Sequence, residues 1–190
     1  MPWNDSDEVV VGGSGQVYVA SVGSTLPSTP SSSLDPASWK GLGYHTEDGV
    51  SVANAPEITR HTAWQSKRPI RIDRQADTFS ISFALLQWDE DSLPLALGGG
   101  TITDLGGGAY KYSPPEPDDA VDERSLVVDV EDGANKLRFV IPRGIAVEGV
   151  DTQFARSSMS SLAITFEALE NDNGDDWYLL TNLAGFAQGS

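Results

Sequence analysis

The sequence TFSISFALLQ, residues 78–87, is the clearest strand in the chain and decides the class of fold. Its large apolar side chains recur at every second position, with small residues between them. Alternation with a period of two is typical of a β-strand that has one buried and one exposed face. We therefore predict that one face of this strand lies in a hydrophobic core, through Phe79, Ile81, Phe83 and Leu85.

A short helix is predicted soon after this strand, over Ser92–Leu97. Asp91 stands at the N-cap position, Pro94 lies in the first turn, where its missing N–H costs nothing, and Gly98 follows the end. The glycine-rich residues 98–112 then predict two short strands. The apolar side of the helix is predicted to consist of Leu93, Ala96 and Leu97.

The residues before the core strand predict several short strands joined by bends. Residues 50–53 and 58–64 are strand-like and lie on either side of Pro56. In Pro69–Arg74, isoleucines alternate with charged residues, which predicts one apolar and one charged face. A turn is expected at residues 74–78, just before the core strand.

Most of the remaining chain also reads as strands. Asp132-Gly133 separates two apolar runs and is a strong hairpin signal. Residues 9–11 and 16–22 predict a small N-terminal hairpin around a glycine-rich turn. The other predicted strands cover residues 125–130, 136–141, 144–152, 160–169 and 176–180.

Residues 23–38 are rich in proline and serine and predict a long loop, or an arm that orders against a neighbour. About ten strand candidates against one short helix predict a mainly β fold of sandwich or barrel type. At 190 residues the chain fits one domain, residues 1–190. No internal repeat of fixed period is visible.

Composition excludes several functional classes. The chain has no cysteine, so disulfides, thiolate metal sites and cysteine nucleophiles are absent. Its formal net charge of −16 gives a surface that repels phosphate, so ordinary DNA binding is not expected. The start, MPWNDSDE, is not a signal peptide, and no apolar run approaches the roughly 20 residues of a membrane span. We expect a soluble protein made in the cytoplasm, with no membrane contact.

No motif supports catalysis, a cofactor or a metal. The only histidines are His45 and His61, and we expect ordinary surface or interface roles for both. The sequence Gly12–Gln16 fails the G-x-S-x-G pattern, and the acidic tract 171–176 does not fit a calcium-binding EF-hand loop. The glycine runs lack the lysine of a phosphate loop. We therefore predict that the protein is not an enzyme and uses no cofactor.

The only basic cluster lies between two acidic regions of the chain. Four of the twelve basic residues fall within eight positions, namely Lys67, Arg68, Arg71 and Arg74. A phosphate-binding patch is one interpretation. We favour the other, in which this face meets acidic loops of an identical subunit and sets the register between copies.

Three phrases in order carry a family resemblance over about a third of the chain. They are LGYHTEDG at residues 42–49, AWQS at residues 63–66, and LLQWDEDSLPLALGGG at residues 85–100. Together they closely resemble the major tail tube protein of long-tailed, siphovirus-type bacteriophages. The resemblance implies two packed antiparallel β-sheets flanked by a helix, in subunits that close into hexameric rings around a central channel.

The resemblance implies that the protein is a structural protein of the virion tail. It also implies assembly in the host cytoplasm. Its subunits would stack as homohexameric rings and conduct DNA during ejection without binding it specifically. The implied partners are the tape-measure protein, the tail terminator and the distal tail or baseplate proteins.

The resemblance also suggests where subunits meet. The N-terminal arm, the loop 23–38, the turn 44–50 and the C-terminal tail 181–190 would be contact arms. The candidate interface residues are Tyr44, Glu47, Asp48, Lys67, Arg68, Arg71 and Arg74. Asp129 and Glu131 alternate with the core positions of their strand and are candidates for the channel lining.

Two other functions remain open at this point. A carbohydrate-binding β-sandwich module is favoured if Trp39, Trp64, Trp88 and Trp177 prove exposed. A β-sandwich hydrolase would need two carboxylates about 5 to 10 Å apart, and the abundance of 28 acids makes that signal nearly uninformative.

Overall fold

The computed structural model of the chain describes residues 9–147, 150, 152–172 and 174–186. The predicted N-terminal arm lies largely outside these residues, as does the end of the C-terminal tail. The described elements, in chain order, are β1 (Ser14–Ser21), β2 (Lys40–Gly41), β3 (His45–Ala63), β4 (Ser66–Leu85), α1 (Ser92–Ala96), β5 (Thr101–Gly106), β6 (Ala109–Ser113), β7 (Arg124–Asp132), β8 (Asn135–Ala146), β9 (Leu162–Ala168), β10 (Tyr178–Thr181) and the 3-10 helix η2 (Ala184–Phe186).

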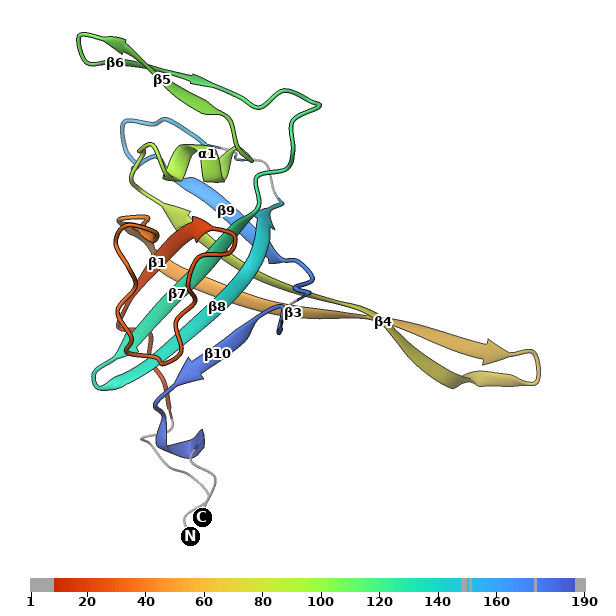
Figure 1. Ribbon diagram of the computed structural model, residues 1–190. Coiled ribbons are helices and arrows are strands. Elements are labelled where there is room, and N and C mark those ends of the chain that lie inside the picture. Colours follow the sequence, from red (N-terminus) through yellow and green to blue (C-terminus); the bar gives the residue numbers. More distant parts are fainter. Residues whose placement is uncertain (1–8, 148–149, 151, 173, 187–190) are drawn as a thin grey trace.

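The predicted fold class is confirmed: the protein is mainly β, with two antiparallel sheets and one short α-helix among the described residues. The large sheet has the order β2-β1-β7-β8-β9-β4-β3, with β10 also paired to β8. Strands β5 and β6 form a separate hairpin. The two packed layers are the halves of the large sheet, which curls so that β1, β7 and β8 face β4 and β9 (Figure 1).

The curl depends on strand β8, whose second edge is shared by two strands. Residues 137–140 pair with β10, whereas Gly144–Ala146 pair with β9. A Cβ atom on Gly144 would lie 2.5 Å from the Phe166 ring and 2.4 Å from the Glu167 carbonyl oxygen. Only glycine lets β9 approach this closely, so Gly144 permits the pairing of β8 with β9 that begins at this residue.

The main core fills the space between the two halves. The side chains predicted for it are confirmed, because Phe79, Ile81, Phe83 and Leu85 are each at most 4% exposed. They meet Leu126 and other residues from β1, β7, β8 and β9. Helix α1 covers one end of this core, mainly through Leu95. The predicted Leu97 is instead exposed, and Asp89 rather than Asp91 accepts the backbone N–H of Ser92, at 2.7 Å.

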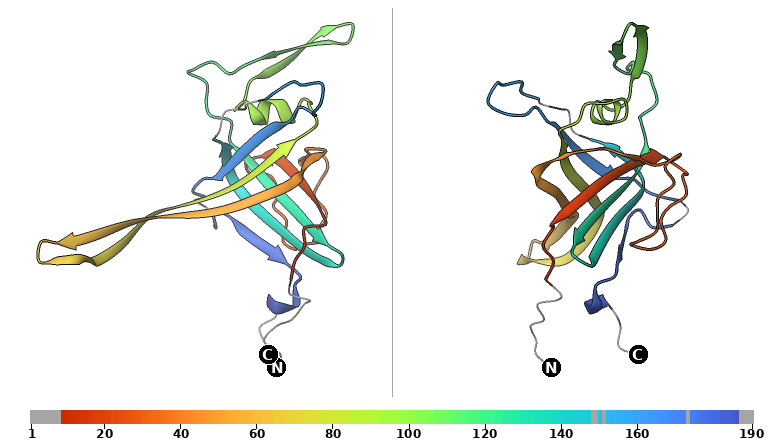
Figure 2. Two further views of the ribbon diagram at one scale, coloured as in Figure 1. Left: turned by 180° about the vertical axis from the view of Figure 1, so that it is seen from behind. Right: turned by 90° about the vertical axis from the view of Figure 1, so that its left-hand side faces the viewer.

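A second, smaller core lies on the outer face of β1, β7 and β8, beneath the loop 23–38. Trp39, Val127 and Val140 are buried there, and Trp39 Nε1 donates to the Thr25 carbonyl at 3.1 Å. The loop therefore packs on its own subunit in this structure. Figure 2 shows it lying against the strands and not extending away from them.

Several predicted turns and strands differ from the structure. The N-terminal hairpin does not form, because β1 pairs with β7 from Ser14 onward, and Gly15 lies too close to the Asp129 carbonyl for a side chain. The bend at Pro56 and the turn at 74–78 are absent, since β3 and β4 run on as two long strands with a register shift between Glu57 and Ile58. Of the predicted strand 144–152, residues 144–146 form the end of β8, and residues 148, 149 and 151 lie outside the described part of the chain.

Candidate interaction surfaces

Strands β3 and β4 form a long hairpin whose outer part leaves the body of the protein. Strand β4 pairs with β9 only over Ser80–Leu85, so residues 55–78 form a two-stranded ribbon, which we call the arm. The arm ends in a tight turn at Trp64-Gln65. Figures 1 and 2 show that it projects far beyond the curled sheet.

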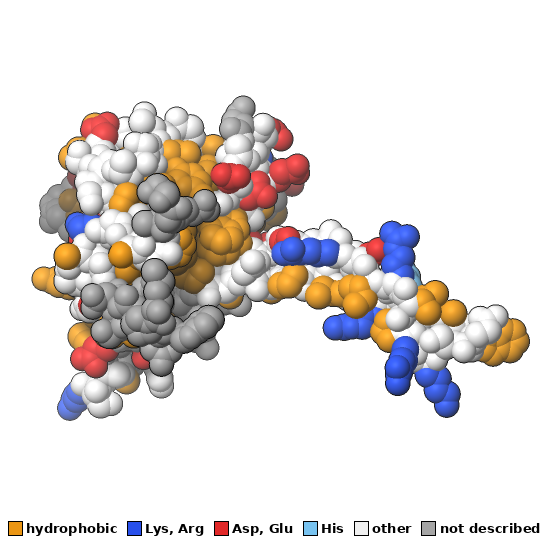
Figure 3. All heavy atoms as spheres, turned by 90° about the horizontal axis from the view of Figure 1, so that it is seen from below, with side chains coloured by type: hydrophobic (Ala, Val, Ile, Leu, Met, Phe, Trp, Pro, Cys, Tyr) orange, Lys and Arg blue, Asp and Glu red, His pale blue; other side chains and the backbone are white. Residues whose placement is uncertain are grey.

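The arm exposes apolar side chains that its own subunit does not cover. No residue of the arm is buried, and the exposed fractions are 41% for Ile58, 65% for Ile70 and 61% for Ile72. Trp64 at the turn is fully exposed, at 101%. Figure 3 shows hydrophobic side chains along the arm, bordered by lysine and arginine. An uncovered group of this kind is typical of a binding surface.

The structure divides the predicted basic cluster into two pairs. Arg71 and Arg74 form ion pairs with acids of the same strand, at 2.7 Å to Asp73 and 2.5 Å to Asp77. Within the described part of the chain, Lys67 and Arg68 form no ion pair. The positive charge that remains available to a partner is therefore concentrated near the turn of the arm.

The other predicted interface residues lie at the opposite end of the hairpin. Tyr44 is 76% exposed, and its backbone N–H donates to Gln87 Oε1 at 2.7 Å. Glu47 and Asp48 lie where β3 separates from β4, beside a groove bounded by the glycines before β1. The structure thus does not bring these three residues together with Lys67 and Arg68.

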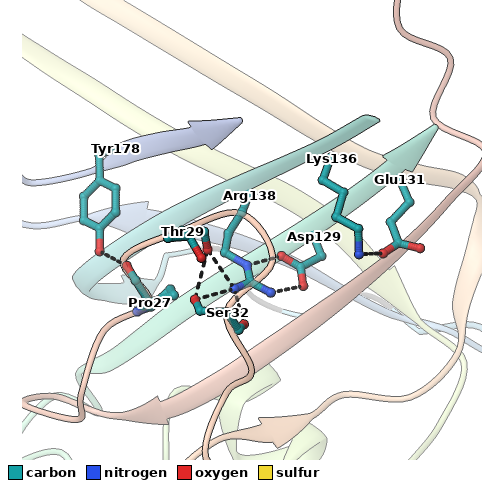
Figure 4. A network of polar contacts seen from close by, with 8 residues as sticks. All are labelled: Pro27, Thr29, Ser32, Asp129, Glu131, Lys136, Arg138 and Tyr178. Carbon is teal, nitrogen blue, oxygen red and sulfur yellow. Dashed lines mark hydrogen bonds and ion pairs between the residues drawn. The ribbon is translucent and has the colours of Figure 1, made fainter. Parts of the chain in front are cut away.

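The candidate channel residues lie on β7, in a network of polar contacts (Figure 4). The Arg138 guanidinium donates to both carboxylate oxygens of Asp129, at 2.6 and 2.7 Å, and to the carbonyls of Thr29 and Ser32. Hydrogen bonding to Asp129 raises the pKa of Arg138, despite its burial. The Arg138 guanidinium therefore balances the charge of Asp129 beneath the loop 23–38.

Glu131 lies closer to the end of β7, where its carboxylate accepts a hydrogen bond from Lys136 Nζ at 2.8 Å. Both side chains are more than a third exposed. The hydrogen bond to Glu131 raises the pKa of Lys136. The assignment of Asp129 and Glu131 to a channel stays a prediction, and Glu131 is the more accessible of the two.

A groove between α1 and the β5–β6 hairpin was not predicted from the sequence. It has a volume of about 520 Å³ and combines aromatic walls with two acids at its rim. The residues that line it are Trp88, Asp89, Glu90, Leu93, Ile102, Tyr110 and Tyr112. The signal for this groove in the sequence is that Tyr110 and Tyr112 occur at alternate positions of one predicted strand, so that both lie on one face.

The four tryptophans named for carbohydrate binding do not share a surface. Trp39 is only 4% exposed, and Trp177 stacks on Phe79 with ring centroids 3.8 Å apart. Trp64 lies at the end of the arm, and Trp88 lines the groove. A flat sugar-binding platform built from several of these rings is therefore absent.

The two histidines also lie in separate places. His45 is half-buried at the start of β3, edge-on to the Phe83 ring, and its burial lowers its pKa. His61 lies on the arm, with Nε2 3.0 Å from Asp73 Oδ2. Among the described residues, no three His, Asp or Glu side chains gather closely enough to hold a metal ion. None of the helices in that part of the chain has the length and apolar character needed to cross a membrane.

Comparison with known proteins supports the resemblance noted in the sequence. The model of a family described as phage tail tube protein matches residues 1–187. A search of curated proteins found no match. Because the family match spans nearly all of the 190 residues, the chain belongs to the phage tail tube protein family, whose members are structural, non-enzymatic proteins of the virion tail that assemble with themselves and with other tail proteins.

Proposed function

We propose that six copies of this protein close into a ring and that the rings stack into the tube of a siphovirus-type tail. The channel of this tube would conduct phage DNA during ejection. The observation that carries the proposal is the arm, in which no residue is buried by the subunit itself. An isolated two-stranded ribbon is at best marginally stable in water, so the arm is expected to gain stability from neighbouring subunits.

The free edge of the large sheet supports the same proposal. Among the described residues, β3 pairs only with β4, which leaves its other edge without a strand partner. An open edge of this length invites uncontrolled pairing unless something covers it. Ring closure would cover this edge with the next subunit, and a second heterologous contact, repeated from ring to ring, would build the stack.

The acidic composition suits a conduit. Six subunits of charge −16 would carry about −96 per ring, and acids that face the channel would repel the DNA backbone without offering it a binding site. Within this proposal Glu131 and Asp129 remain the channel candidates, and the pairing of Asp129 with Arg138 makes Glu131 the first to test.

Assembly would take place in the host cytoplasm around a tape-measure protein. The tail terminator would close one end, and the distal tail or baseplate proteins would initiate the other. Tyr44, Glu47 and Asp48 would contact a neighbour at the base of the hairpin, while the arm contacts a neighbour farther away. The loop 23–38 packs on its own subunit and would contribute its outward surface to these contacts.

Electron microscopy of the purified protein, combined with sedimentation velocity, tests this proposal. We expect rings with sixfold symmetry, or tubes, that appear above a threshold protein concentration. The distal tail initiator should lower that threshold. A protein that remains monomeric at every concentration and ionic strength, even with the initiator present, would refute the proposal.

A further inference from the structure

Two surfaces of the subunit have complementary character and lie far apart. One is the tip of the arm, which consists of Trp64-Gln65 and the neighbouring Lys67 and Arg68. The other is the groove between α1 and the β5–β6 hairpin. Figure 1 and the left view of Figure 2 show the arm pointing away from α1, β5 and β6. The two surfaces of one subunit therefore do not meet.

The tip has the composition of an interface anchor. Trp64 is fully exposed, although large aromatic side chains and arginine are the residues that most often carry binding energy when they become buried. It lies at the end of a ribbon with five basic and three acidic residues, in an otherwise acidic protein. A partner for this tip should offer an apolar pocket with negative charge at its edge.

The groove offers both properties. Its walls include Tyr110, Tyr112 and Leu93, and its volume falls within the range of roughly 300 to 1,000 Å³ that accommodates small molecules. An indole ring is smaller than such ligands. Tyr110 is 69% exposed and Trp88 is 42% exposed, so the aromatic walls lack cover in the isolated subunit.

The segment of chain that carries the groove is strongly acidic. Residues 89–123 contain nine acids and one lysine. Asp89 and Glu90 line the groove, and burial, together with the charges of these two acids, raises the pKa of the neighbouring Asp91. Cations are therefore attracted to this edge of the groove, and like-charged partners are repelled.

We propose that the tip of the arm of one subunit docks into this groove on a second copy of the chain. The Trp64 indole would lie between Tyr110, Tyr112 and Leu93, while Lys67 and Arg68 approach Asp89 and Glu90. This assignment rests on the proposed function, because it names the receptor of the arm within the assembly. A contact between two different surfaces is heterologous, so it generates a ring or an open stack instead of a closed dimer.

Disulfide trapping tests this contact directly, because the chain contains no cysteine of its own. One variant carries Gln65→Cys at the tip and another carries Glu90→Cys at the rim, and both positions are exposed. Under mild oxidation, we expect the mixture to give a disulfide-linked dimer at least tenfold more efficiently than Gln65→Cys mixed with Ser33→Cys. A chain with both cysteines should give a ladder of larger species.

Substitutions of exposed residues provide an independent measurement. Trp64→Ala and Tyr110→Ser should each reduce the yield of tubes at least tenfold, and the double variant should lose little more than either one, since both remove the same contact. Leu105→Ser on β5 is the matched control, because Leu105 is 63% exposed and does not line the groove.

The outcomes separate this inference from the proposed function. Tubes that form normally with Trp64→Ala, together with trapping no better than the Ser33 control, would show that the groove is not the receptor while leaving the tube proposal intact. Absence of any self-association in the wild-type protein would overturn both.

Discussion

Strand β4 passes through two different environments along its length. Phe79, Ile81, Phe83 and Leu85 are buried in the core of the body, whereas Ile70 and Ile72 are exposed to about the extent of ordinary surface residues. Both parts alternate apolar and polar residues and both pair with β3. The difference is that β9 and the facing half-sheet cover only the first part. The body is stabilised by contacts within its own chain, whereas the apolar side chains of the arm are left uncovered by that chain.

The largest expected effect lies on the body side of this comparison. Phe83→Ala should lower the free energy of unfolding of the unassembled subunit by about 3–5 kcal/mol, because it leaves a cavity in the core. Ile72→Ala on the arm should change that free energy by less than about 0.5 kcal/mol. Urea denaturation followed by tryptophan fluorescence measures both. Equal losses would show that the arm is also part of the folded core.

The next prediction concerns how much the contacts of the loop 23–38 with the body stabilise the subunit. Arg138→Met should destabilise the subunit by about 2–3 kcal/mol, because it leaves Asp129 unpaired under the loop. The double variant with Asp129→Leu is the control and should recover most of this loss, since no charge is then left alone. If the single variant unfolds like the wild type, the ion pair does not hold the loop.

On the arm, charge reversal should affect assembly without affecting folding. Lys67→Glu with Arg68→Glu should raise the protein concentration needed for tubes at least tenfold, with unchanged urea unfolding. Arg71→Glu with Arg74→Glu should have a smaller effect, because Asp73 and Asp77 already neutralise these two residues. High salt should also weaken wild-type assembly. An equal or larger effect of the second pair would place the interface farther from the turn.

The smallest effect concerns the two histidines, one in each region. Burial lowers the pKa of His45 below its ordinary value of 6.5, so the unfolded chain takes up the proton more readily. Stability should therefore be unaffected by this group well above pH 6.5, and it should fall as the pH is lowered through 6.5 toward the folded pKa. Urea midpoints measured between about pH 5 and 8 should show a weaker decline for His45→Gln. His61→Gln on the arm is the control.

The sequence was most informative where local pattern and burial agree. The period-two pattern of residues 78–87 identified four core positions, and Asp132-Gly133 located the turn between β7 and β8. The assembly was inferred from the family resemblance, because no pattern of single residues indicates it. These features depend on short segments of chain, so they can be read before the fold is known.

The errors occurred where tertiary contacts override local signals. Pro56 predicted a bend, yet the sheet accommodates it in β3, an edge strand, where a missing N–H need not break a ladder. The glycine-rich residues 12–15 predicted a turn, but Gly15 lies within β1 and allows its close approach to β7. The groove depends on β5 and β6 folding back over α1, a juxtaposition that no local pattern shows.

The register shift between Glu57 and Ile58 has a mechanical consequence for any tube that these arms connect. On the proximal side of the shift the ribbon continues into a sheet of several strands, and on the distal side it is only two strands wide. A bulge disrupts the ladder locally and bends the strand that contains it. The register shift therefore gives the arm a point of bending near its root. A tube held together by such arms would bend by small elastic rotations at these points, while the contacts at the tips stay intact.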